Sequence, residues 1–182
     1  MTNSFKYARL GLGQDNMANR SYTYFSKERK DYYDQINNSE NKQLGDEAEK
    51  RVCEYLNSIG VPARMSGSDE DSKSHADIVL RDGTTIDVKC KNSVVIELKN
   101  FWGNPGWIFT GADYIYNIVR SGPHKDEMYV YKRQDMVDFI KRCPNLFQEK
   151  YCKTYDGKSV LYFFPYSTLN SSSMKFVKCI KL

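Results

Sequence analysis

The sequence predicts an α/β domain with a mixed central sheet flanked by helices. Three observations lead to this expectation. Apolar residues between Leu44 and Ile59 follow the helical period, Asp82-Gly83 joins two β-rich runs, and strand and helix signals alternate further along the chain. Such alternation is typical of a sheet covered by helices and excludes an all-helical or all-β fold.

The length and composition indicate one globular protein. The 182 residues are enough for one domain with a substantial core, and the 40% hydrophobic and 14% aromatic fractions exclude global disorder. No apolar run approaches the roughly 20 residues that span a bilayer, and the N-terminus lacks the apolar core of a secretory signal, so we expect a cytoplasmic protein. Five cysteines without paired two-residue spacing favour reduced thiols.

We expect two parts in the chain. Residues 1–41 are rich in Asn, Ser, Tyr and charge, and we interpret them as a partly ordered N-terminal extension or arm. Residues 42–182 form the domain. The extension contains "SYTYFSKERKDYYDQINN", whose aromatic and basic residues suit stacking on nucleic acid. We favour the alternative, in which it packs on its own domain or on a second subunit.

The first elements of the domain are a helix and a hairpin. The helix runs from Leu44 to Ile59, with Gly60 as its stop, and Glu49 lies at the border of its apolar stripe. The segment "VPAR" predicts a short strand that leads into a polar loop. The run "ADIVLRDGTTIDVKC" then predicts a hairpin, because Asp-Gly between apolar runs is a strong turn signal.

The remaining elements alternate. "SVVIELKNF" and "EMYVYKR" predict strands, and "DMVDFIKRC" predicts a helix. Thr110 and Asp113 match a helix-capping pattern, which predicts another helix from about Gly111. "KSVLYFFPYSTL" and "MKFVKCIKL" predict late strands. We expect Trp102, Trp107 and Phe109 to be core aromatics, with a loop that faces DNA as the alternative.

The predicted hairpin brings together three of its charged residues, Asp77, Asp87 and Lys89. Asp77 opens its first strand and Asp87 lies on its second, so the turn places them on neighbouring strands at about the same level. Lys89 points the same way as Asp87, because side chains alternate along a strand. The apolar residues of the second strand, Ile86, Val88 and Cys90, occupy the other face.

Two carboxylates and a lysine on one face suit phosphodiester hydrolysis. This reaction requires neutralisation of charge on the phosphoryl group and a hydroxide aligned with the leaving oxygen. Carboxylates hold Mg²⁺, which prefers oxygen ligands and keeps several waters, while a nearby lysine positions or deprotonates the attacking water.

At this level of detail the chain resembles the PD-(D/E)XK nucleases, especially their Holliday-junction resolvase and restriction-endonuclease-like branches. "LGDEAEKRVCEYLNSIGVPAR" resembles the family's helix and carries Glu49, "HADIVL" resembles the strand that opens with Asp77, and "IDVKCK" resembles the acid-x-Lys strand of Asp87 and Lys89. The similarity covers roughly residues 44–100, with a softer similarity beyond. The chain departs from the family pattern at Ala76, where proline is frequent.

The resemblance implies a restriction-endonuclease-like fold and a Mg²⁺-dependent DNA endonuclease, with Mn²⁺ as a substitute metal. Glu49, Asp77 and Asp87 would be the metal-binding acids, and Lys89 would complete the catalytic set. It further implies a sheet-floored cleft and often a homodimer. The small size, without a recognisable DNA-reading module, favours branched or otherwise structured DNA as the substrate.

Alternatives remain at the residue level. Glu47 competes with Glu49 for the role of the helical carboxylate, and Glu97 with Lys99 forms a second acid-x-Lys pair on the next strand. His75 could touch a phosphate, although we favour a solvent-side histidine. Four further residues are candidates for contact with the nucleic-acid backbone: Ser66, Ser68, Lys91 and Lys99.

The charge distribution is compatible with a polyanionic partner. The net charge is +4. From Lys141 onward the sequence has eight lysines and arginines and two acids, which gives this C-terminal segment +6 and leaves −2 for the preceding residues. A second hypothesis from another class fits the same fold: a non-catalytic protein that keeps the nuclease scaffold to bind nucleic acid or a protein partner.

Overall fold

The computed structural model describes residues 40–67, 75–100, 102–148 and 159–182. The expected N-terminal arm at 1–39 therefore lies outside the described residues. The last two residues of the expected extension, Glu40 and Asn41, belong to the first described helix, α2 (Glu40–Ser58). This helix begins four residues before the predicted one. It ends as expected, because Gly60 has φ 79° and the Val61 N–H donates to the Leu56 carbonyl at 2.9 Å.

A six-stranded mixed sheet forms the centre of the fold, as the sequence predicted. Its strands follow the order β1-β2-β3-β5-β6-β8. Strands β3 and β5 are parallel, and the other neighbours are antiparallel. The strands are β1 (Ala63–Met65), β2 (Ile78–Leu80), β3 (Thr85–Lys91), β5 (Tyr114–Val119), β6 (Glu127–Lys132) and β8 (Lys178–Lys181).

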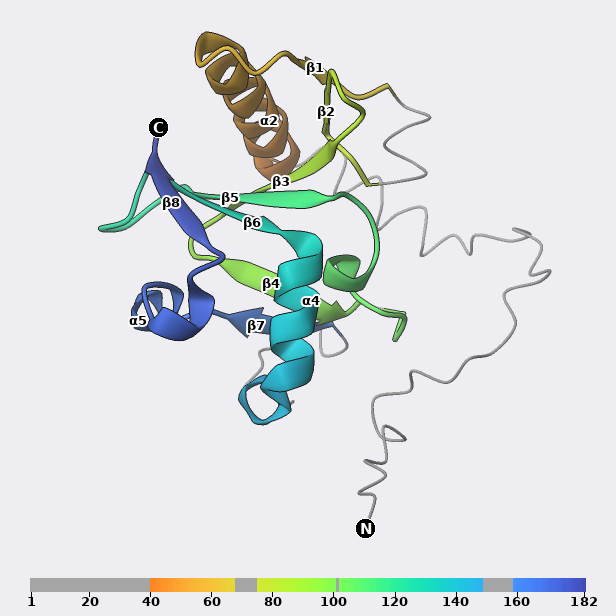
Figure 1. The fold of residues 1–182 in the computed structure, drawn as a ribbon, viewed down its shortest axis with the longest axis vertical. Coiled ribbons are helices and arrows are strands. Elements are labelled where there is room, and N and C mark those ends of the chain that lie inside the picture. Colours follow the sequence, from red (N-terminus) through yellow and green to blue (C-terminus); the bar gives the residue numbers. More distant parts are fainter. Residues whose placement is uncertain (1–39, 68–74, 101, 149–158) are drawn as a thin grey trace, which may run out of the picture. The chain divides into compact units, whose positions relative to one another are not determined.

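Elements cover both faces of this sheet. Figure 1 shows α2 on one side, and α4 (Arg133–Arg142), β4 (Val95–Lys99) and β7 (Val160–Phe163) on the other. Strands β4 and β7 form a separate antiparallel pair. The short helix α5 (Tyr166–Leu169) and the 3₁₀ turns η1 (Trp107–Phe109), η2 (Pro144–Phe147) and η4 (Ser172–Met174) complete the described elements. The parallel strands β3 and β5 are therefore connected by a crossover that contains β4 and η1.

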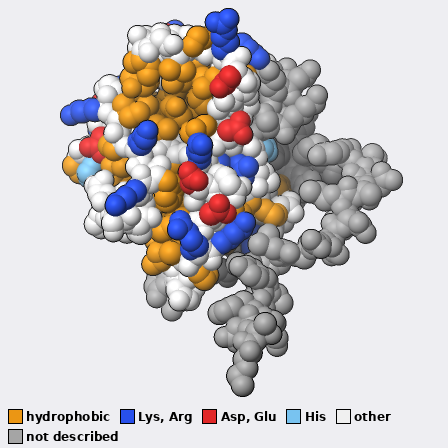
Figure 2. Space-filling view, viewed as in Figure 1, with side chains coloured by type: hydrophobic (Ala, Val, Ile, Leu, Met, Phe, Trp, Pro, Cys, Tyr) orange, Lys and Arg blue, Asp and Glu red, His pale blue; other side chains and the backbone are white. Residues whose placement is uncertain are grey.

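The α2 side of the sheet holds the smaller of two apolar clusters. The predicted stripe of α2, with Ala48, Val52 and Leu56, packs on Ile86 and Val88 of β3. Further members come from β2, β5 and β6: Ile78, Ile118, Met128 and Val130. Figure 2 shows hydrophobic side chains gathered in the upper part of that view, over the part of the fold where Figure 1 places α2 beside the sheet.

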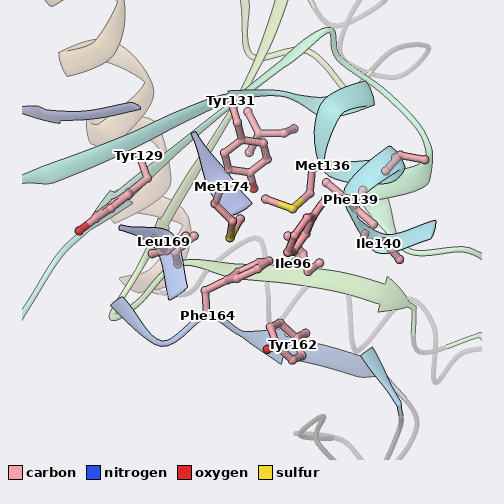
Figure 3. Packing of buried hydrophobic residues seen from close by; sticks show 14 of the residues in the cluster. Ile96, Tyr129, Tyr131, Met136, Phe139, Ile140, Tyr162, Phe164, Leu169 and Met174 are labelled. Carbon is pink, nitrogen blue, oxygen red and sulfur yellow. The ribbon is translucent and has the colours of Figure 1, made fainter. Parts of the chain in front are cut away.

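The opposite side holds the larger cluster. Tyr131 points from β6 toward Met136 of α4 and Met174, while Ile96 and Phe164 close the cluster from below (Figure 3). Phe139 and Phe147 contribute an edge-to-face pair with ring centroids 5.8 Å apart. Asp87 and Lys89 point toward this side, because their partners across β3 and β5 are Ile115 and Asn117. The charged face of β3 is therefore covered by other elements and does not simply face water.

The predicted helix from Gly111 is wrong, because residues 114–119 form strand β5. The Asp113 carboxylate does not cap its own helix. It accepts hydrogen bonds from the backbone N–H and the hydroxyl of Thr85 at 3.0 and 2.9 Å, and the Asp113 N–H donates to the same hydroxyl at 3.0 Å. The Thr-x-x-Asp pattern thus connects the starts of two parallel strands, and the β-branched and aromatic residues that follow suit a sheet.

Asp113→Ala is expected to destabilise the protein by about 1–2 kcal/mol, since it removes two charge-assisted hydrogen bonds to Thr85. Urea denaturation followed by circular dichroism measures the difference. Asp138→Ala on the exposed face of α4 is the control, with an expected change within about 0.5 kcal/mol. Equal effects of the two variants would contradict the role of Asp113.

Two broader expectations can be compared with the described residues. Four cysteines in this part of the chain, Cys53, Cys90, Cys143 and Cys179, carry free thiols, as expected. Cys152 lies outside it. None of the described helices has the length and apolar character that a membrane span requires.

Candidate active site

Asp77 occupies the entrance to β2, between two other strands. Its backbone N–H donates to the Ile86 carbonyl at 2.9 Å, and its carbonyl accepts from the Ser66 N–H at 2.8 Å. The carboxylate accepts a hydrogen bond from the Val88 backbone N–H at 2.6 Å. The side chain of Asp77 is therefore held against β3, beside the residue that separates Asp87 from Lys89.

Asp87 and Lys89 form an ion pair on β3. The Lys89 ammonium lies 2.5 Å from Asp87 Oδ1, and the two side chains are 25% and 3% exposed. The alternation of side chains along β3 thus places both charges on one face, as the sequence predicted. A buried carboxylate needs such a partner, because an unpaired charge in this environment would be strongly destabilised.

Glu49 is the helical carboxylate that acts on this pair. It is partly buried and follows Ala48 at the border of the apolar stripe of α2. Its charge contributes to the pKa shifts of both Asp77 and Lys89. Glu47 is exposed, and its charge acts on Cys90.

The electrostatics of the site reflect crowded carboxylates. Burial and the neighbouring Asp87 charge raise the pKa of Asp77 to about 8, against the opposing effects of Lys89 and the Val88 N–H, and Glu49 adds to the rise. Burial alone would lower the pKa of Lys89, but the charges of Asp87 and Asp77 outweigh it and leave this pKa raised. Lys89 is therefore a cation at neutral pH, surrounded by the three acids Glu49, Asp77 and Asp87.

Trp107 and Glu97 complete one wall of the site. The Lys89 ammonium lies 5.3 Å from the centroid of the Trp107 ring, within the range of a cation–π interaction. The backbone N–H of Trp107 donates to Glu97 Oε2 at 3.3 Å. Glu97, the acid of the second acid-x-Lys pair, is therefore connected to the site by its hydrogen bond with Trp107. The charges that shift the pKa of Asp77 are those of Asp87, Lys89 and Glu49. Trp107 and Phe109 pack partly buried against the larger cluster, as expected of core aromatics, but the expectation is wrong for Trp102, which is 39% exposed. The sequence did not predict the contact of Trp107 with Lys89.

Asn117 and Tyr131 are buried polar neighbours that the sequence reading did not single out. Asn117 pairs with Lys89 across β3 and β5, and its Nδ2 donates to the Val95 carbonyl at 3.2 Å. Burial raises the pKa of the Tyr131 hydroxyl, Asn117 opposes this rise, and Asp87 adds to it. The available sequence signal for Asn117 was a polar residue inside the apolar run "YIYNIV". Its register with Lys89 follows only from the parallel pairing of β3 and β5.

The candidates for nucleic-acid contact lie at different places. Ser66 pairs through its backbone with Asp77, beside the site. Lys91 closes β3, two residues beyond Lys89, and is exposed. Lys99 belongs to β4 in the second sheet and bridges to Pro105. Ser68 lies outside the described residues, and His75 is exposed with φ 49°.

The donor set fits a hard divalent cation in kind. Carboxylate oxygens are the ligands that Mg²⁺ prefers. Burial, together with the charge of Asp87, raises the pKa of Asp77, and a bound cation would oppose this rise. As the side chains stand, no three His, Cys, Asp or Glu residues within the described ranges are grouped closely enough to hold a metal ion. The carboxylates of Glu49, Asp77 and Asp87 do not form such a group in this structure.

Asp77→Asn is expected to stabilise the metal-free protein at pH 8.5 by at least about 1 kcal/mol. Between the ordinary carboxyl pKa of 3.8 and about 8, native Asp77 keeps a proton that the unfolded chain releases, so the free energy of unfolding falls as pH rises through this window. Asparagine removes the charge and keeps an acceptor for the Val88 N–H.

Thermal unfolding in EDTA at several pH values tests this expectation. The difference in melting temperature between Asp77→Asn and the wild type should increase from pH 4 to pH 8.5. A difference in melting temperature that stays constant across this range would show that Asp77 has the ordinary carboxyl pKa.

No protein-family model and no curated protein matches this chain.

Proposed function

We propose that the protein is a metal-dependent DNA endonuclease with a restriction-endonuclease-like fold. The observation that carries the proposal is the buried Asp87–Lys89 pair on β3, with the Asp77 carboxylate held beside it by the Val88 N–H. Helix α2 adds Glu49 at the border of the same layer. The helical acid, the strand that opens with an acid and the acid-x-Lys strand follow one another as in PD-(D/E)XK nucleases.

Each residue has a role that its surroundings support. Asp77, Asp87 and Glu49 would hold Mg²⁺, which supplies Lewis-acid stabilisation and a more acidic bound water when present. Lys89 stays protonated between the acids and orients the attacking water toward the phosphorus while it stabilises the charge on the phosphoryl oxygens. The Trp107 ring limits the positions of the Lys89 ammonium, which preorganises this charge.

The substrate we propose is branched or otherwise structured DNA. The described helices and strands belong to the sheet or to the layers that cover it. Direct readout of a DNA sequence requires a separate element that enters a groove of the duplex. Contacts with phosphates position a protein on nucleic acid without reading its sequence. Recognition of DNA shape is therefore the simpler expectation for this domain.

A cleavage assay with the full chain tests the proposal. Supercoiled, linear, single-stranded and four-way-junction DNA are incubated with Mg²⁺, Mn²⁺ or EDTA. We expect cleavage of at least one substrate with Mg²⁺ or Mn²⁺, none with EDTA, and none by Asp87→Asn. The control Asp138→Asn, on the exposed face of α4, should cleave as the wild type does.

Two outcomes would overturn the proposal. Either no substrate is cut with any metal, or Asp87→Asn cuts as well as the wild type. Retained DNA binding without cleavage, measured by fluorescence anisotropy, would favour the non-catalytic binding protein instead.

A further inference from the structure

The ends of the two parallel strands bring a second group of cations next to the candidate active site. Lys91 closes β3, and Arg120 directly follows β5. The Arg120 backbone N–H donates to the Lys91 carbonyl at 2.9 Å, so the two residues are adjacent at the ends of the strands. The residue directly opposite Lys91 is Val119, and the Arg120 side chain turns to the α2 face, where it bonds to Asn41. Lys91 shares its face of β3 with Lys89, two residues earlier, because side chains alternate along the strand.

The Arg120 guanidinium is held in place by neutral groups. Its Nε donates to Asn92 Oδ1 at 2.7 Å, and its Nη1 donates to Asn41 Oδ1 at 3.1 Å. Asn92 Oδ1 also accepts a hydrogen bond from the Ser121 hydroxyl at 2.9 Å. These amide oxygens orient the guanidinium without neutralising it. A preoriented, planar guanidinium is well suited to bind a phosphate, since little further side-chain freedom is lost.

The surroundings of Lys91 show a local excess of positive charge. Although the residue as a whole is exposed, partial burial of its ammonium lowers its pKa, and the charges of Lys89 and Arg120 lower it further, against the opposing effects of Cys90 and Glu97. The nearby Arg51 differs from Arg120, because it forms an ion pair with Asp126 at 2.7 Å. Cations gathered in this way repel one another, and an anion bound between them would relieve the repulsion.

We propose that Lys91 and Arg120 form a phosphate-binding site for the nucleic-acid backbone, next to the phosphate that is cleaved at Asp87 and Lys89. The proposal deepens the endonuclease function and rests on it for the position of the cleaved phosphate. Two residues along β3 span about 6.5 Å, and each strand of duplex DNA carries one charge per about 3.4 Å of helix axis. A DNA strand that runs along β3 therefore presents another phosphate near Lys91 and Arg120.

Anisotropy titrations in EDTA, where no cleavage is expected, test the site directly. Fluorescein-labelled single-stranded, duplex and four-way-junction DNA are titrated with the wild type, Lys91→Ala, Arg120→Ala and the double variant between 50 and 200 mM salt. Each single variant should weaken binding about tenfold. The slope of log K against log salt should become shallower by about 0.7–0.9 for each cation removed.

The control and a second variant keep the test independent of folding. Lys141→Ala removes an exposed cation of α4 and should leave the affinity and the salt slope unchanged. Lys91→Ala changes an exposed residue at a strand end, so its effect is measurable even if Arg120→Ala fails to fold. Asn92→Ala removes one support of the guanidinium, keeps both cations, and should weaken binding without changing the salt slope.

The outcomes separate the two proposals. If the wild type cleaves DNA while Lys91→Ala and the folded Arg120 variant bind with wild-type affinity and slope, the phosphate site is wrong and the endonuclease stands. If the variants weaken binding but the wild type never cleaves, the site stands and the endonuclease is wrong. Absence of binding to every DNA would overturn the phosphate site as well.

Discussion

Lys89→Met is expected to lower the rate of DNA cleavage by about 10²–10⁴-fold, with little change in DNA affinity. The ammonium of Lys89 lies against Asp87 Oδ1 and over the Trp107 ring, so it is a fixed charge at the point where the proposed reaction develops negative charge. Methionine keeps much of the side-chain volume and removes the charge together with its hydrogen bond to Asp87. Single-turnover cleavage with Mg²⁺, combined with anisotropy titrations, separates the chemical step from binding.

The control for this variant must account for Asp87, which loses its partner. A buried carboxylate without a counter-charge can destabilise the fold by several kcal/mol. Lys89→Gln keeps a hydrogen-bond donor, and the double variant Asp87→Asn/Lys89→Met removes both charges. All three variants should be folded by circular dichroism at the assay temperature and inactive, whereas Lys141→Met should be active. A folded Lys89→Gln with wild-type rate would exclude a catalytic role for the lysine.

Gly106→Ala is expected to reduce the free energy of unfolding by about 3 kcal/mol, the largest stability effect that we predict. A Cβ atom at this position would lie 2.0 Å from the Glu97 carbonyl oxygen and 2.4 Å from its carbon. These are backbone atoms of β4, so a side-chain rotation cannot relieve the overlap. The Gly106 N–H also donates to the Leu98 carbonyl at 3.1 Å, so separation of the two segments would weaken this hydrogen bond.

Gly45→Ala in α2 is the matched control for the stability measurement. Its Cβ would find only Glu49 Oε1, at 4.0 Å, and alanine favours a helix interior over glycine by about 0.5–1 kcal/mol. Urea denaturation should therefore shift in opposite directions for the two variants. Because Gly106 precedes Trp107, its variant should also cleave DNA more slowly. A Gly106→Ala protein as stable as the wild type would show that β4 and η1 are less closely packed.

The sequence predicted the elements whose signals are local. The helical period located α2, and Asp-Gly located the turn of the hairpin, where Gly83 has φ 88°. The prediction failed at Thr110 and Asp113, because the pattern that predicted a helix cap instead precedes strand β5. Asp113 bonds to Thr85, which is 28 residues earlier in the chain, and no local pattern contains that partner.

The residues that surround Lys89 show the same limit. Trp107 reaches it from η1, and Asn117 lies beside it on β5. Both belong to the crossover or to the strand that follows it, so their proximity depends on the parallel pairing of β3 and β5. Arg120 enters the second group of cations through the same pairing.

The sequence by itself determined that Asp87 and Lys89 share a face of one strand, since alternation is a local property of extended backbone. It also determined that Glu49 borders the apolar stripe of its helix. Only the tertiary structure decided that this face is buried, that Asp77 is held against Val88, and that the pKa of Asp77 rises to about 8. Burial and charge interactions depend on which distant elements pack together, and the spacing of residues along the chain does not specify that packing.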